Sequence, residues 1–196
     1  MATVIRVLLA DDLAAHRSVL KASLRTVGPD LGVEFDIKGE AEDGQQLLNL
    51  YSQAAPGAID LIFSDILMPV MDGLSALVKI RQLSPTQKIV MASSEDLKTI
   101  DTANTKLGET ARKTVEQTQR MDLLNKVAER IRKGQTEEGK TNSILTGCEK
   151  LALDPIWVAE QYGANGYLRK PYDVAKSKEL IQHVLQTASI QFLAKV

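Results

Sequence analysis

Short apolar runs that alternate with amphipathic segments are the feature that most constrains this sequence. The runs at 4–10 and 59–65 are rich in leucine and β-branched residues, as expected of strands buried on both faces of a parallel sheet. The segments 33–41 and 88–94 predict two more strands, and apolar residues at helical spacing follow each of the first three strands. This alternation, with its short connections, indicates a parallel sheet covered by helices on both faces.

The alternation stops after the fourth predicted strand. Residues 96–153 are polar, contain no strand-like run and include long stretches of helix-forming residues. Apolar residues such as Leu124 and Ile131 fit a helical stripe only loosely. We therefore expect one or two exposed helices, broken near Gly108 and again from Gly134.

The alternation resumes after Pro155. A short helix near Trp157, a fifth strand at 166–170 and a closing helix from Asp173 complete the chain. Gly28-Pro29 is expected to end the first helix, because both residues disfavour helical backbone. We predict a single α/β domain over residues 1–196, with 96–153 as a helical insertion between the fourth strand and the helix near Trp157.

Composition excludes several classes of protein. With 196 residues, 44% of them hydrophobic, the chain can bury the core of one ordinary domain, which excludes a disordered tail. A formal net charge of -1 gives no general reason to expect nucleic acid or a membrane surface as partner. Cys148 is the only cysteine, so no intrachain disulfide can form. No membrane-spanning run and no signal-peptide pattern occurs, so we expect a cytoplasmic location.

Charged and hydroxyl side chains stand at the C-terminal ends of the predicted strands. Asp11 and Asp12 follow the first strand, Asp65 ends the third, Ser93 lies at the end of the fourth, and Lys170 ends the fifth. Ligands bind at this edge of an open parallel sheet, so we expect these side chains to converge there. Crowded carboxylates need a compensating cation, and oxygen ligands suit a hard divalent ion, most simply Mg²⁺.

Four motifs at these strand ends make the sequence recognisable. LLADD, SDILMPVMDG, MASSE and GYLRKP occur in this order and closely resemble the receiver domain of two-component response regulators, over residues 4–95 and 154–194. Each motif alone is common, whereas the ordered set is highly specific. The resemblance implies a flavodoxin-like, doubly wound, five-stranded parallel sheet in the order 2-1-3-4-5. It also implies that a sensor histidine kinase or a phosphotransfer protein donates a phosphoryl group to the chain.

The resemblance assigns the phosphoacceptor and the metal ligands. Asp65 matches the aspartate that forms the acyl phosphate. Asp12, Asp65 and the backbone carbonyl of Leu67 match the Mg²⁺ ligands, and Asp11 matches an acid that acts mainly through water. Self-catalysed phosphorylation and dephosphorylation are expected, and no metabolic enzyme activity. An aspartyl phosphatase would need a second acid at the position of Leu67.

The resemblance also assigns the residues around the phosphoryl group. Ser93 matches the hydroxyl that hydrogen-bonds a phosphoryl oxygen, with Ser94 as the alternative, and Lys170 matches the cation that pairs with that group. Pro171 matches a proline that follows a cis peptide bond. Tyr167 matches an aromatic residue that changes rotamer as the hydroxyl moves, although an ordinary half-buried strand residue is the competing interpretation.

The sequence departs from the family in its second half. Ser93 and Lys170 are 77 residues apart, far more than in an ordinary receiver, and the chain ends soon after the closing helix. We therefore expect a downstream protein to bind the segment 96–153 together with the face formed by the helix near Trp157, the fifth strand and the closing helix. Our hypothesis is that phosphorylation shifts the inserted helices between two arrangements.

Three alternatives stay open at this stage. A scaffold that works without phosphorylation could use the same fold. The basic residues of 120–133 are best explained as a solvated helix face, with nucleic-acid contact as the weaker option. The long connection also permits a domain-swapped homodimer. His16 and His183 lie in predicted helices and are expected to be surface or packing residues.

Overall fold

The computed structural model describes residues 2–94, 107–134, 143–151 and 153–187. Its centre is a five-stranded parallel sheet in the order β2-β1-β3-β4-β5, which confirms the predicted doubly wound fold. The strands are β1 (Thr3–Ala10), β2 (Val33–Ala41), β3 (Leu61–Asp65), β4 (Lys88–Ser93) and β5 (Gly166–Arg169).

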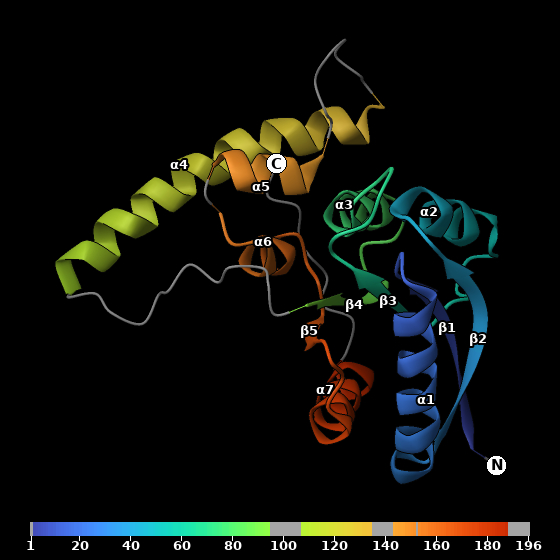
Figure 1. Ribbon diagram of the computed structural model, residues 1–196. Coiled ribbons are helices and arrows are strands. Elements are labelled where there is room, and N and C mark those ends of the chain that lie inside the picture. Colours follow the sequence, from blue (N-terminus) through green and yellow to red (C-terminus); the bar gives the residue numbers. More distant parts are fainter. Residues whose placement is uncertain (1, 95–106, 135–142, 152, 188–196) are drawn as a thin grey trace.

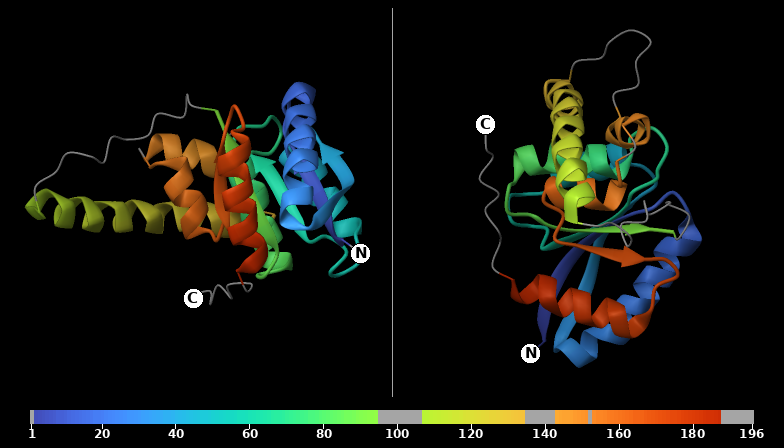
Figure 2. Two further views of the ribbon diagram at one scale, coloured as in Figure 1. Left: turned by 90° about the horizontal axis from the view of Figure 1, so that it is seen from below. Right: turned by 90° about the vertical axis from the view of Figure 1, so that its left-hand side faces the viewer.

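Helices cover both faces of the sheet (Figure 1). One face packs against α1 (Ala14–Leu31) and α7 (Val174–Gln186). The other packs against α2 (Gly44–Gln53), α3 (Gly73–Leu83) and α6 (Pro155–Gln161). The two remaining helices, α4 (Leu107–Arg132) and α5 (Ile144–Lys150), lie on this second side (Figure 2). No helix in the described part of the chain is long and apolar enough to cross a membrane.

The buried stretches of the central strands are mainly apolar because both of their faces are covered. In β1, Val7 and Leu9 pack into the core beneath α1 and α7, whereas Leu8 and Ala10 pack into the core on the opposite face. Successive side chains of a strand point to opposite faces, so a strand covered on both sides needs apolar residues at every position. The same rule explains why all five residues of β3 are buried.

The first helix continues past its predicted end. It runs through Pro29 to Leu31 and ends at Gly32, whose φ of 68° is the left-handed conformation that favours glycine. Gly28 serves a different purpose, because a Cβ there would lie 2.8 Å from the carbonyl oxygen of Val33. The Gly28-Pro29 pair therefore marks a close approach of α1 to β2, and the prediction that it ends the helix was wrong.

The helices of segment 96–153 are less exposed than predicted. Leu124, Ala128 and Ile131 of α4 are buried and belong to the same apolar core as α3, α5 and α6. Their spacing of four and three residues places them on one face of the helix, which is the stripe that the sequence showed only loosely. The C-terminal half of α4 is therefore exposed on one face, as expected, but buried on the other, and Ile144 in α5 is also buried.

The predicted helix breaks are partly borne out. The described helix α4 begins at Leu107, so Gly108 lies in its first turn and does not interrupt it. Gly134 follows the end of α4 and has a positive φ, as the predicted break requires. Residues 96–106 and 135–142 of the segment lie outside the described residues.

Burial of the α4 stripe makes a prediction about stability. Replacing the fully buried Leu124 by alanine should lower the free energy of unfolding by about 2–5 kcal/mol, because a cavity forms within the core shared with α3. Leu123 is the matched control, since half of its side chain is exposed and its replacement should change that energy by less than about 0.5 kcal/mol. Urea denaturation measures both variants. Equal effects would mean that α4 does not share the core.

Candidate functional site

Three aspartates meet where β1 and β3 end. Asp11 and Asp12 directly follow β1, and Asp65 is the last residue of the neighbouring β3. One carboxylate oxygen from each aspartate lies within 4.8 Å of the others. Asp11 and Asp65 are buried, whereas Asp12 is exposed. The sheet therefore gathers the three acids that the sequence places at strand ends.

The ammonium of Lys170 completes this cluster from the end of β5. Its Nζ lies 2.6 Å from Asp11 Oδ2 and 2.8 Å from Asp65 Oδ2, and the side chain is 6% exposed. The Lys170 backbone N–H donates to the Ser93 carbonyl at 2.8 Å, which fixes the end of β5 against β4. The Lys170-Pro171 peptide bond is cis.

Burial and charge act in opposite directions on Asp65. Burial is the largest influence and raises the pKa of this carboxyl above its ordinary value. The hydrogen bond and the charge of Lys170 oppose that rise, as does a hydrogen bond from the Leu67 backbone N–H, whereas the Asp11 carboxylate adds to it. The Lys170 ammonium therefore favours the ionised form of Asp65 against the effect of burial.

The loop between Asp65 and α3 packs tightly against the end of β3. The Gly73 backbone N–H donates to the Ile66 carbonyl at 2.9 Å, and a Cβ at Gly73 would lie only 1.9 Å from the carbonyl oxygen of Asp65. No other residue fits at position 73 without moving the backbone that carries Asp65. Within the loop, Val70 has a φ of 61°, a strained value for a β-branched residue, and its side chain is exposed.

The hydroxyl residues at the end of β4 differ in burial. Ser93 is buried and Ser94 is exposed. Tyr167 on the adjacent β5 is half-buried, and its hydroxyl has a raised pKa, chiefly because of burial, while a hydrogen bond with the Ser93 side chain lowers it. The structure thus brings Ser93 and Tyr167 together on one side of the acidic cluster.

Sequence reasoning missed two residues in the first turns of α1. His16 Nδ1 lies 3.2 Å from Asp11 Oδ1 and 3.3 Å from Lys170 Nζ, so it is not a remote surface residue. Arg17 is buried, and its Nη1 donates to the Asp11 carbonyl at 2.6 Å while its Nε donates to Glu40. Their place one helical turn after the aspartate pair is the signal that could have revealed them.

The acidic cluster offers oxygen ligands in the form that hard cations prefer. Its three aspartates converge without a histidine or cysteine among the clustered ligands. Mg²⁺ and Ca²⁺ bind such oxygen sets, whereas zinc sites commonly include nitrogen or sulfur ligands. The donor set therefore fits a magnesium-type ion, as the sequence predicted.

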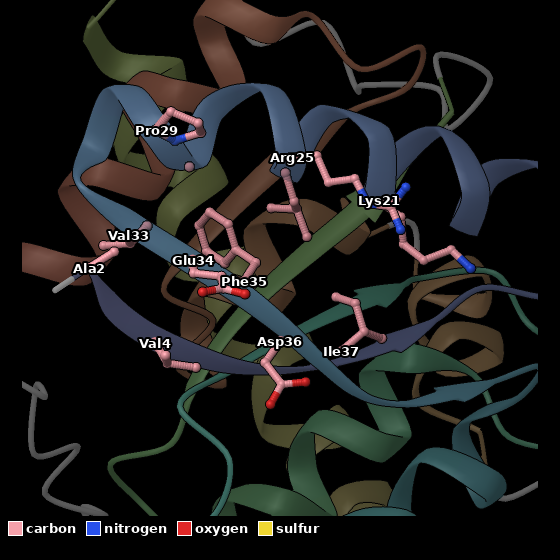
Figure 3. Close-up of a pocket in the computed structure, with 12 residues that line it drawn as sticks. Ala2, Val4, Lys21, Arg25, Pro29, Val33, Glu34, Phe35, Asp36 and Ile37 are labelled. Carbon is pink, nitrogen blue, oxygen red and sulfur yellow. The ribbon is translucent and has the colours of Figure 1, made fainter.

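A separate pocket lies beside α1 and the edge strand β2 (Figure 3). Phe35 lies among its lining residues together with Lys21, Arg25, Glu34 and Asp36. None of the three clustered aspartates nor Lys170 lines it. Because the lining carries both signs of charge, its electrostatics select no single class of ligand.

Comparison with known sequences agrees with the geometry of the cluster. The family model described as response regulator receiver domain matches residues 7–128. The chain is 37% identical over 89 residues to chemotaxis protein CheY of Bacillus subtilis (strain 168), a match that covers 45% of this chain and 67% of that protein. A protein-glutamate methylesterase/protein-glutamine glutaminase of Azospirillum brasilense is 35% identical over 97 residues, which are 50% of this chain and 23% of that protein.

Solved structures share the fold. The CheX-CheY-BeF3-Mg complex from Borrelia burgdorferi matches with a TM-score of 0.56 and 20% identity, covering 93% of this chain and 90% of that chain. A response regulator receiver domain protein from Clostridium thermocellum matches with a TM-score of 0.54 and 16% identity, covering 92% and 94% of the two chains. Together with the family match over most of the chain, these findings show that the chain belongs to the response regulator receiver domain family.

Proposed function

We propose that this chain acts as a response regulator that accepts a phosphoryl group on Asp65 from a sensor histidine kinase or a phosphotransfer protein. One observation carries the proposal. The Lys170 ammonium lies between the buried carboxylates of Asp11 and Asp65, at the edge of the sheet where Asp12 also stands. A nucleophilic carboxylate beside a fixed cation is what phosphoryl transfer to aspartate requires.

The chemistry needs little beyond positioning and charge. An Asp65 carboxylate oxygen attacks phosphorus, the bond from phosphorus to the donor histidine nitrogen breaks, and an acyl phosphate results. Lys170 pairs with an oxygen of the transferred group, and the Ser93 hydroxyl donates a hydrogen bond to another. Tyr167 changes rotamer together with Ser93, an assignment supported by the place of Tyr167 on β5, the strand that pairs with the end of β4.

The proposed metal ligands are Asp12, Asp65 and the Leu67 carbonyl, with Asp11 acting mainly through water. When bound, Mg²⁺ would add its positive charge to that of Lys170 and so stabilise the developing negative charge on the phosphorus-bound oxygens. The tight loop from Ile66 to Gly73 supports the role of Leu67, because its backbone is fixed against Asp65. Arg17 supports the role of Asp11, because it holds the Asp11 carbonyl.

The proposed output surface is the face of α6, β5 and α7 together with the segment 96–153, which we interpret as an insertion in the domain formed by the whole chain. A downstream protein would bind there. The position of the segment directly after β4 supports this assignment, because Ser93 ends that strand. A homodimer that exchanges elements across the long connection is the alternative assembly.

Phosphorylation itself tests the proposal. We expect the protein to gain one phosphoryl group from acetyl phosphate only when Mg²⁺ is present, and Asp65→Asn to gain none, because the amide is no nucleophile for this step. Intact-protein mass spectrometry at neutral pH measures the gain. Asp30→Asn is the matched control, since Asp30 forms an exposed ion pair with Lys178 away from the acidic cluster and its loss should leave phosphorylation unchanged.

Two outcomes would contradict the proposal. Magnesium-dependent phosphorylation that persists in Asp65→Asn would assign the acceptor to another residue. A folded protein that takes up neither a phosphoryl group nor beryllofluoride would instead support a scaffold that works without phosphorylation.

A second prediction concerns competition between Lys170 and the metal. The ammonium contacts two of the three clustered aspartates, so Mg²⁺ must bind against a nearby positive charge. Lys170→Met should therefore bind Mg²⁺ roughly tenfold more tightly, because like-charge repulsion at close range exceeds about 1.4 kcal/mol even at a high effective dielectric. Isothermal titration calorimetry measures the affinity.

The control for this prediction is Lys178→Met, which removes an equal charge from an exposed ion pair with Asp30. Its Mg²⁺ affinity should match that of the unmodified protein. Unchanged or weaker binding by Lys170→Met would show that the ammonium does not compete with the metal.

A further inference from the structure

The segment 96–153 touches the loop that follows Asp65. Ser143, just before α5, donates its hydroxyl to Asp72 Oδ2 at 2.7 Å. The backbone N–H of Ile144 donates to Ser75 Oγ at 3.0 Å. The first turn of α5 is thus hydrogen-bonded to the first turn of α3, although the two are separated by about seventy residues of sequence.

Asp72 is the residue that begins α3. Its carboxylate accepts the Ser75 backbone N–H at 2.8 Å and the Ser75 hydroxyl at 2.7 Å, as expected of a helix N-cap. Asp72 is buried, and no salt bridge to it occurs among the residues that the structure describes. Hydroxyl and amide donors therefore stabilise a buried carboxylate, so each donor matters.

Asp72 is also rigidly connected to the proposed metal site. The next residue, Gly73, bonds Ile66 through its backbone and leaves no space for a side chain against the Asp65 carbonyl. The loop between these residues contains Leu67, whose backbone N–H bonds the Asp65 carboxylate. A shift of Asp72 would therefore move the backbone that carries two of the three proposed metal ligands, Asp65 and Leu67.

We propose that Ser143 is a positioning residue for the metal site, which acts through Asp72 on the loop that carries Leu67. This inference rests on the proposed function, because it concerns the same Mg²⁺ ligands. Coupling between two sites is reciprocal. If the Ser143–Asp72 hydrogen bond favours metal binding, then metal binding must stabilise that hydrogen bond and the start of α5. The segment 96–153 is then coupled to the proposed metal site by two connections: the hydrogen bonds to the start of α3 and the covalent link to the end of β4.

Metal affinity tests the proposal without any phosphoryl donor. Ser143→Ala should bind Mg²⁺ roughly fivefold more weakly, at the lower end of typical coupling between sites, and Ser143→Thr should restore binding because it keeps the hydroxyl. Ser84→Ala is the matched control, since Ser84 caps the other end of α3 and its replacement should leave the affinity unchanged. Isothermal titration calorimetry measures all four proteins.

Two further measurements separate positioning from simple stabilisation. Asp72→Asn retains a good helix cap, so Ser143→Ala should have no additional effect on affinity in that background if Ser143 acts through the Asp72 carboxylate. Reciprocity predicts that Mg²⁺ slows hydrogen exchange of the Ile144 and Thr146 backbone amides, which bond Ser75 Oγ and Ser143 Oγ.

The outcomes are distinguishable. If Ser143→Ala lowers the melting temperature but binds Mg²⁺ as tightly as the unmodified protein, Ser143 is structural only and the inference is wrong. If the metal leaves exchange at Ile144 and Thr146 unchanged, reciprocity fails and the inference is again wrong. If the unmodified protein binds no Mg²⁺, the proposed function itself fails.

Discussion

The ion pairs of Lys170 with Asp11 and Asp65 depend on the order of the strands. β1 and β3 are neighbours, whereas β5 lies two strands away from β3, a separation of about 10 Å between strand axes. Only a long side chain at the end of β5 can cross β4 to reach both carboxylates, and the lysine stem does so while its ammonium stays buried. Another strand order would leave these charges buried without partners, which is strongly destabilising.

The same arrangement suits a divalent ion. With its three aspartates ionised, the cluster has three negative charges and the one positive charge of Lys170. A monovalent cation would therefore leave one negative charge without compensation. A divalent oxygen-binding cation would neutralise it, and such neutralisation favours the ionised form of Asp65 against the effect of burial. Charge balance therefore links the proposed metal to the proposed nucleophile, Asp65, independently of any phosphoryl donor.

The sheet and most of the candidate site were predictable from sequence because apolar runs mark the strands and charged residues stand where those runs end. A parallel sheet brings the ends of its strands to one edge, so Asp65 and Lys170 could be grouped without coordinates. His16 was missed because its place one turn after the aspartate pair shows only that it is near them, whereas its contacts depend on which way that turn of α1 faces. The end of α1 was mispredicted because Gly28 marks a close approach to β2 and not a terminus. The α4 stripe was underestimated because few apolar residues among many polar ones suffice to pack a helix.

Two kinds of contact hold the segment 96–153 against the rest of the domain: apolar packing and hydrogen bonds. The apolar stripe of α4 packs with α3 and the other helices of this side in one core. Hydrophobic packing is non-directional, so by itself it does not fix the exact position of one helix along another. The bond from Ser143 to Asp72 is directional, so it fixes the register of α5 against α3. Because Asp72 borders the loop after Asp65 and the segment itself follows Ser93, the segment meets the proposed site from two sides.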